Sequence, residues 1–177
     1  NGGLQLLDVH VAVHQLEEID DPYVTILCPP CTLHSQLNQG TNLKYMDSPK
    51  NRVRRKEANQ LFDFACLVAE RRHRQGRKFV LEHPIGSSAW RRRRARRLMR
   101  VIGQTPVRAD LCRYGMNVTG GKLRNLKPTG FLTNDPTLQQ ALSLRCNCQN
   151  GHEVLEGKRM TKAAEIYPPA LCRTIVK

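Results

Sequence analysis

The chain has few aromatic and acidic residues and lacks any long apolar run. Only 5% of its 177 residues are aromatic, and 15 Asp and Glu oppose 29 Lys and Arg. The apolar runs are too short to span a bilayer, and no segment has the pattern of an amphipathic membrane helix. Without a repeat or a long linker, we expect a single domain over residues 1–177, with no membrane partner.

The cysteines do not form the even, regular framework that is typical of a secreted disulfide-bonded domain. Their number is odd, and no signal peptide precedes them, so we expect an intracellular, reducing setting rather than secretion. The chain opens at Asn1 without an initiator Met, which suggests a piece of a longer protein. The seven cysteines are Cys28, Cys31, Cys66, Cys112, Cys146, Cys148 and Cys172.

The strongest compositional signal is positive charge. The formal net charge is +14 and the isoelectric point is near 10.0, while an apolar content of 40% is ordinary for a folded domain. This balance predicts a polyanionic partner, with nucleic acid favoured over an anionic membrane surface. It also favours a nuclear or nucleoid location.

An arginine-rich run from Trp90 to Arg100 is the candidate for contacts with a nucleic-acid backbone. As a helix it keeps one apolar face and spreads its arginines over the rest of the surface. The alternative is a solvated face that pairs with acidic segments such as residues 17–21. Trp90 itself is expected to anchor the helix in the core. The predicted phosphate-binding residues are Arg91, Arg92, Arg93, Arg94, Arg96 and Arg97.

Predicted strands and helices alternate along the chain, which indicates an α/β fold with a mainly parallel sheet. A further strand at residues 6–13 has a partly alternating pattern. A helix is expected from about Arg54 to Arg74, and shorter helices are expected after the capping residues 87–88, after residues 134–135 and from residues 168–169. The main predicted strands are residues 23–27, 78–84, 106–112 and 127–133.

Two of these strands end in residues that could take part in catalysis or metal binding. Cys28 and Cys31 bracket two prolines after the first strand, a pattern that fits a metal clip, a disulfide, a redox pair or a positioned nucleophile. We interpret Cys28 as the last residue of the buried strand and Cys31 as a displayed thiol, whose pKa nearby positive charge would lower. Glu82 ends an apolar strand, where a partly buried carboxyl group can hold a proton and donate it.

Several short motifs together resemble the DNA cytosine-5 methyltransferases, most closely the compact, divergent members encoded by phages and mobile-element polyproteins. The likeness spans roughly residues 22–176. No Phe-x-Gly-x-Gly loop, which binds the cofactor in the family, precedes the first motif. The motifs are Pro-Pro-Cys-x-x-x-Ser (Pro29, Pro30, Cys31, Ser35), Phe-Val-Leu-Glu-His-Pro (79–84), Cys-Arg-Tyr-Gly (112–115) with Lys-Pro-Thr-Gly-Phe-Leu-Thr-Asn (127–134), and Tyr-Pro-Pro-Ala-Leu-Cys-Arg-Thr-Ile (167–175).

The resemblance implies a Rossmann-like class I methyltransferase domain that uses S-adenosylmethionine, and it favours DNA over RNA as the partner. A flipped cytosine would be attacked at C6 by Cys31, while Glu82 would hydrogen-bond N3. Arg113 or Lys127 would help to hold the base or its backbone, and Ser35 would shape the loop. The absence of the Phe-x-Gly-x-Gly loop and of a separate target-recognition domain implies an incomplete domain. The alternative is a catalytically inactive, basic nucleic-acid-binding domain of a mobile-element polyprotein.

A second group of thiols lies near the C-terminus. Cys146, Cys148 and His152 share one loop, and with Cys172 or Cys112 they could form a four-ligand zinc site. The Cys-x-Cys-x-x-x-His spacing is not that of a common zinc finger. We therefore expect packed thiols and no metal, and we keep a small zinc-binding module as a third interpretation.

Overall fold

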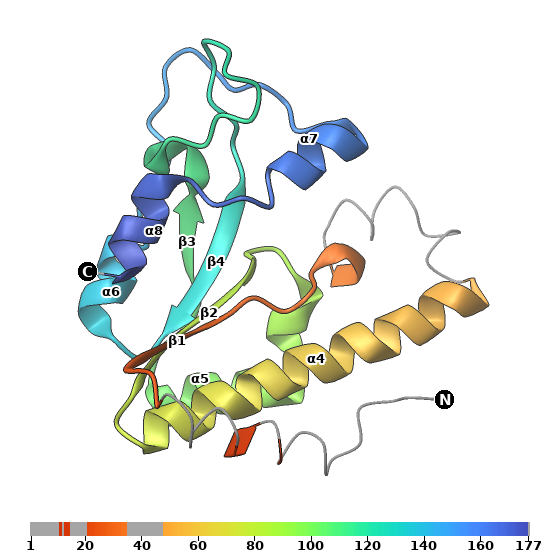
Figure 1. Cartoon of the computed structure of the whole chain (residues 1–177), viewed down its shortest axis with the longest axis vertical. Coiled ribbons are helices and arrows are strands. Elements are labelled where there is room, and N and C mark those ends of the chain that lie inside the picture. The colour runs from red at the N-terminus through yellow and green to blue at the C-terminus, as the bar shows by residue number, and fades with distance from the viewer. Residues whose placement is uncertain (1–10, 12, 15–20, 35–47, 177) are drawn as a thin grey trace.

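The computed structural model describes residues 11, 13–14, 21–34 and 48–176 (Figure 1). Most of the strand predicted at residues 6–13 lies outside these residues, and within it Val11 and Val13 are helical rather than extended. No helix in the described ranges is long and apolar enough to cross a membrane.

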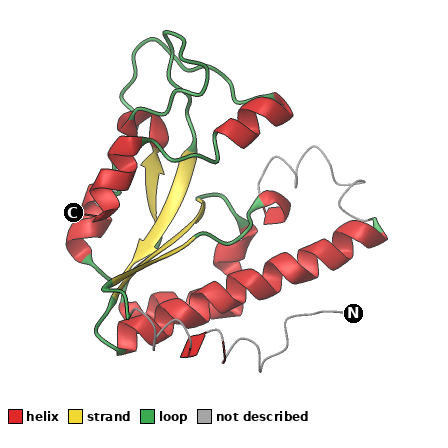
Figure 2. Cartoon of the chain, in the orientation of Figure 1, coloured by secondary structure: helices red, strands yellow, loops and turns green. Residues whose placement is uncertain are grey.

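The centre of the fold is a four-stranded mixed sheet (Figure 2). Only the pair β1·β2 is parallel, because β4 runs antiparallel to both of its neighbours, β2 and β3. The prediction of an α/β fold is thus confirmed, and the prediction of a mainly parallel sheet is wrong. In spatial order the strands are β1 (Val24–Leu27), β2 (Lys78–Pro84), β4 (Pro128–Thr133) and β3 (Val107–Asp110).

The reversal of β4 follows from the segment that connects it to β3. Parallel neighbours need a crossover connection, usually a helix. Residues 111–127 hold only the single 3₁₀ turn η3 (Leu111–Tyr114), which ends at Gly115 with a φ of 87°. The chain therefore turns back beside β3. Since β3 is antiparallel to β4, it runs in the same direction as β1 and β2.

The long helix α4 (Pro49–Arg74) covers one face of the sheet. It begins before the predicted Arg54 because Ser48 caps it: the Ser48 Oγ accepts a hydrogen bond from the Asn51 N–H at 3.3 Å. Proline at the first helical position is compatible with this start. The helix ends before Gly76, whose φ is 69°.

The remaining helices are short, and most follow the predicted caps. Ser87 caps the 3₁₀ turn η2 (Ser88–Arg91), and Asp135 caps α6 by accepting from two backbone N–H groups. The strand predicted at residues 106–112 is shorter and ends at Asp110. The α-helices are α5 (Arg93–Ile102), α6 (Pro136–Ala141), α8 (Pro169–Val176) and α7 (Gly157–Ala163), of which the sequence did not predict α7.

Two apolar clusters sandwich the sheet. One lies between the sheet and α4 with α5, and the other between the sheet and α8 with α6 (Figure 1). Strand β2 contributes to both, because alternate side chains point to opposite faces: Phe79 and Leu81 enter the first cluster and Val80 enters the second. Trp90 is buried in the first cluster, as predicted, and its indole N–H donates to the Pro84 carbonyl at 2.9 Å.

Candidate active site at the carboxyl edge of the sheet

Three chain segments with polar side chains meet at one edge of the sheet. Because β1 and β2 are parallel neighbours, the Cys-Pro-Pro-Cys segment that follows β1 and Glu82 near the end of β2 lie at the same edge. Strand β4 runs the opposite way and begins at this edge, so Lys127, immediately before it, is brought there too. This edge unites Cys31, Glu82 and Lys127.

Glu82 is the buried acid of the site. Only 8% of the residue is exposed, and burial raises the pKa of its carboxyl group above the usual range. The Lys127 ammonium and a hydrogen bond from Tyr167 oppose this shift without cancelling it. Glu82 is therefore disposed to hold a proton at a higher pH than an exposed glutamate.

Tyr167 is a site residue that the sequence interpretation did not assign. It lies between α7 and α8, and its hydroxyl oxygen is 3.4 Å from the Cys28 sulfur. The Lys127 ammonium lies 5.9 Å from the centre of the Tyr167 ring and donates a hydrogen bond to the Ala164 carbonyl at 2.8 Å. Burial, followed by the negative charge of Glu82, raises the pKa of the phenol. The Tyr-Pro-Pro motif that begins at Tyr167 was the sequence signal that could have identified this residue.

Cys31 is half-buried, and its raised pKa means that the thiol is protonated at neutral pH. Burial raises its pKa, Glu82 raises it further, and Lys127 opposes them. The positive charge of Lys127 lowers this pKa in the predicted direction, but burial and Glu82 outweigh it, so the net shift is upward. The Cys31 carbonyl accepts the His34 N–H at 2.9 Å, which closes the turn η1 (Thr32–His34) directly after the thiol.

Cys28 does not have the predicted place in a buried strand. Strand β1 ends at Leu27, and Cys28 is an exposed residue of the following segment. The proline after it has no N–H to donate and so does not continue the ladder with β2. Desolvation of the thiol raises the pKa of Cys28, and the Tyr167 hydroxyl opposes the shift. Cys28 therefore belongs to the site's rim.

His83, next to Glu82 in β2, points to the opposite face of the sheet. It is fully buried between the rings of Phe62 and His34, with centroid distances of 5.0 and 5.7 Å. Burial lowers its pKa to about 4, so the imidazole is neutral at physiological pH. His83 is thus a core residue, not part of the edge that holds Glu82.

Ser35 and Arg113 are the two other predicted substrate-binding residues. Ser35 lies outside the described residues. Arg113 is half-buried in η3, where its charge lowers the pKa of the Tyr114 phenol against the larger effect of burial. A role in substrate binding for either residue stays a prediction.

The arginine-rich segment is divided between structural and exposed side chains. Arg92 forms a two-bond contact with Asp63 of α4, at 2.9 and 2.5 Å, and Arg97 contacts Glu70 of α4 at 3.1 Å. Of the predicted acidic partners at residues 17–21, the structure describes only Asp21, which pairs with Arg72 of α4 and with Arg77. Arg91, Arg93 and Arg96 are exposed, and Arg94 is half-buried.

A second group of polar side chains, here called the Cys/His cluster, lies beyond β3. Its four potential ligand atoms all lie within 4.8 Å of one another. Of the two candidates for the fourth member, the structure selects Cys112, since Cys172 is exposed on α8. The cluster consists of Cys112, Cys146, Cys148 and His152.

Neither a protein-family model nor a curated protein matches the chain. The site and the fold therefore carry the functional interpretation.

Proposed function

We propose that the chain carries out nucleophilic addition to cytosine in nucleic acid, as the covalent step of a DNA cytosine-5 methyltransferase-like reaction. The observation that carries the proposal is the buried Glu82 on the strand beside Cys31. A nucleophilic thiol and an acid with a raised pKa are the two groups that addition to a cytosine ring requires.

The chemistry assigns one role to each side chain. The Cys31 thiol loses its proton to solvent, and the thiolate sulfur forms a bond to C6 of a cytosine that has left the base stack. The electron pair of the C5–C6 double bond moves into the C4–C5 bond and displaces the C4–N3 pair onto N3, where the Glu82 carboxyl group donates a hydrogen bond and stabilises the developing charge. C5 thereby becomes nucleophilic and takes a proton from water. Loss of the original C5 proton then restores the C5–C6 double bond and releases the Cys31 thiolate.

Lys127 and Tyr167 position the acid and the incoming base. The Lys127 ammonium is held by the Ala164 carbonyl and lies beside the Tyr167 ring, so it is fixed near Glu82. A fixed cation there attracts the phosphate backbone and moderates the proton affinity of Glu82. Raised pKa values at a site with a specific charge partner are typical of catalytic groups.

A class I methyltransferase-like fold is part of this proposal. Strands β1, β2 and β3 run in one direction, and β4 is inserted between β2 and β3 in reverse. In such sheets ligands bind beyond the carboxyl ends of the parallel strands, where Cys31 and Glu82 lie.

The resemblance names S-adenosylmethionine as the methyl donor. The chain contains no Phe-x-Gly-x-Gly motif, and none of the described strands runs into a glycine-rich turn of that kind. The residues present therefore do not fit the donor, and the proposal for this chain concerns the covalent step at C6.

An oligonucleotide that contains 5-azacytosine tests the proposal without a methyl donor. Nitrogen at ring position 5 makes C6 more electrophilic, and protonation of that nitrogen after attack leaves a stable adduct. We expect a covalent protein–DNA complex that survives denaturation, is lost in Cys31→Ala and persists in Cys28→Ala. Equal adduct formation in both variants, or none with the unaltered chain, would overturn the proposal.

The second candidate function is a non-catalytic nucleic-acid-binding domain. The exposed arginines Arg91, Arg93 and Arg96 on one segment favour it. It predicts salt-dependent binding that is unchanged in Cys31→Ala, together with no adduct on 5-azacytosine DNA. The same two assays thus distinguish the candidates.

A further inference from the structure

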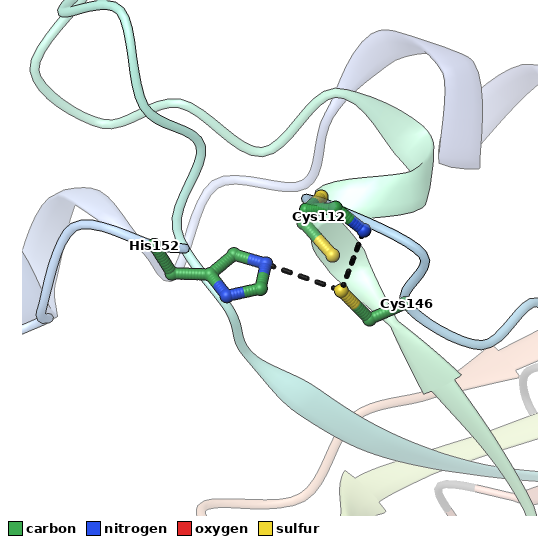
Figure 3. Close-up of side chains that lie close together, drawn as sticks. Cys112, Cys146 and His152 are labelled. Atoms are coloured by element: carbon green, nitrogen blue, oxygen red, sulfur yellow. Dashed lines mark hydrogen bonds between the residues drawn. The ribbon is translucent and has the colours of Figure 1, made fainter. Parts of the chain in front are cut away.

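Four metal-ligating side chains from two chain segments converge beyond the end of β3, and Figure 3 shows three of them, Cys112, Cys146 and His152. Cys112 comes from η3, whereas Cys146, Cys148 and His152 come from the single connection between α6 and α7. The Cys146 sulfur is 3.3 Å from His152 Nε2. Cys112 is distant in sequence from the other three residues, so its approach to them is a result of tertiary packing.

The segment that carries Cys146 is anchored by a buried aspartate. Asp110, 2% exposed at the end of β3, accepts the Cys146 N–H at 2.8 Å, and its own N–H donates to the Leu144 carbonyl at 2.9 Å. Arg108 holds the other carboxylate oxygen at 2.7 Å. These bonds place Cys146 beside Cys112, which follows Asp110 by two residues.

The segment that carries His152 has a separate anchor. Asn125 is fully buried, and its side-chain NH₂ donates to the Glu153 carbonyl at 3.0 Å. The Glu153 N–H donates to the Arg124 carbonyl at 3.0 Å, and the Arg124 guanidinium donates to the Cys112 carbonyl at the same distance. The polypeptide thus holds His152 against the thiols through bonds that do not involve the ligand atoms.

The arrangement matches the coordination that zinc prefers. Zinc binds sulfur at about 2.3 Å and imidazole nitrogen at about 2.0 Å in a tetrahedron, so ligand atoms lie about 3.5–3.8 Å apart. The atoms of the Cys/His cluster, within 4.8 Å of one another, need only a small contraction to reach that geometry. In addition, the Cys148 N–H donates to the Cys146 sulfur at 3.3 Å, a bond that favours the thiolate form.

We propose that the Cys/His cluster binds one zinc ion as a structural site. Three sulfurs and one nitrogen fill all four tetrahedral positions, which leaves no open position for catalysis. The ion would hold η3 to the connection between α6 and α7. It would also steady Lys127, because the Leu111 N–H, next to Cys112, donates to the Lys127 carbonyl at 3.2 Å. The zinc site does not depend on the proposed activity at cytosine.

The test is the metal content of the full chain purified without chelator. We expect zinc at about one ion per chain. The substitutions Cys146→Ser, Cys148→Ser and His152→Ala should each lower the zinc content, while Cys172→Ser, which removes an exposed thiol outside the cluster, should leave it unchanged. Zinc retained by the cluster variants at the level of Cys172→Ser would overturn the proposal.

A second measurement covers variants that fail to fold. Replacing the metal with cobalt(II) in the unaltered chain should give the visible bands of a tetrahedral site and the near-ultraviolet charge-transfer band of cobalt–thiolate bonds. Absence of these bands would overturn the proposal. So would a disulfide in the cluster, detected as fewer than the seven thiols of the sequence when the unreduced, denatured chain is titrated.

Discussion

The hydroxyl oxygen of Tyr167 lies 3.4 Å from the sulfur of Cys28, although 139 residues separate them. This contact brings the segment before α8 onto the end of β1, beside Glu82 and Lys127. The tyrosine thereby closes one side of the candidate site. The charges around the Cys31 thiol come from Glu82 and Lys127, and their effects on its reactivity have opposite signs.

The first prediction concerns Glu82→Gln. The Glu82 charge raises the pKa of Cys31, so its removal lowers that pKa and increases the thiolate fraction at a given pH. We expect Cys31 to react several-fold faster with iodoacetamide at pH 8 in this variant, measured by mass spectrometry of the Cys31 peptide. The exposed Cys172, in the same digest, is the internal control and should not change. An unchanged or slower rate at Cys31 would contradict the assigned charge.

The second prediction is the opposite response in Lys127→Met. The ammonium lowers the pKa of Cys31, so removing the charge while keeping an unbranched side chain should slow alkylation of the thiol. The same assay and the same internal control apply. A faster rate would show that Lys127 does not act on Cys31 in the assigned direction.

Glu82 also makes stability depend on pH. Its folded-state pKa is raised, so the folded state favours the protonated acid. This contribution is fully present below the unfolded-state pKa, near 4.5, and is lost as pH rises through the folded pKa. Each unit of difference between the two pKa values corresponds to about 1.4 kcal/mol.

Glu82→Gln resembles the protonated acid. As pH rises from 4 to 8, this variant should therefore lose less folding stability than the unaltered chain. Urea unfolding of both chains at several pH values measures the difference. Parallel stability curves over that range would mean that Glu82 has an ordinary pKa.

Much of the site's local structure was predictable from sequence, while its long-range contacts were not. The strand ends at Cys31 and Glu82 follow from apolar runs stopped by prolines, which are local signals. The reversal of β4 depends on the lack of a crossover helix in residues 111–127. The length of this segment alone is compatible with either a parallel or an antiparallel β4. Tyr167 and Cys112 meet their partners only through tertiary packing, so no spacing rule could assign them. The raised pKa of Cys31 depends on burial, which sequence does not give.

The arginine-rich segment yields a fourth prediction. Arg93 and Arg96 are exposed, whereas Arg92 is paired with Asp63. We expect Arg93→Gln with Arg96→Gln to weaken DNA binding and to reduce the slope of log K against log salt by about 0.9 for each lost phosphate contact. Fluorescence anisotropy over a salt series measures both.

Arg92→Gln is the matched control, because it removes the same charge from a side chain that is held to α4. It should lower the unfolding temperature and change the salt slope less than the loss of an exposed arginine. Equal salt slopes for Arg92→Gln and the unaltered chain would agree with this. If the salt slope is unaffected by loss of Arg93 and Arg96, the arginine-rich segment does not contact the DNA backbone as proposed.

The central claim, that Cys31 adds to C6 of cytosine with Glu82 at N3, predicts exchange of the C5 hydrogen. Addition makes C5 basic enough to take a deuteron from D₂O, and elimination then releases the C5 proton and the thiolate. Mass spectrometry of a cytosine-containing DNA strand incubated in D₂O should show deuterium at C5 with the unaltered chain and with Cys28→Ala, and none with Cys31→Ala. Absence of exchange with the unaltered chain, or exchange that persists in Cys31→Ala, would contradict the account.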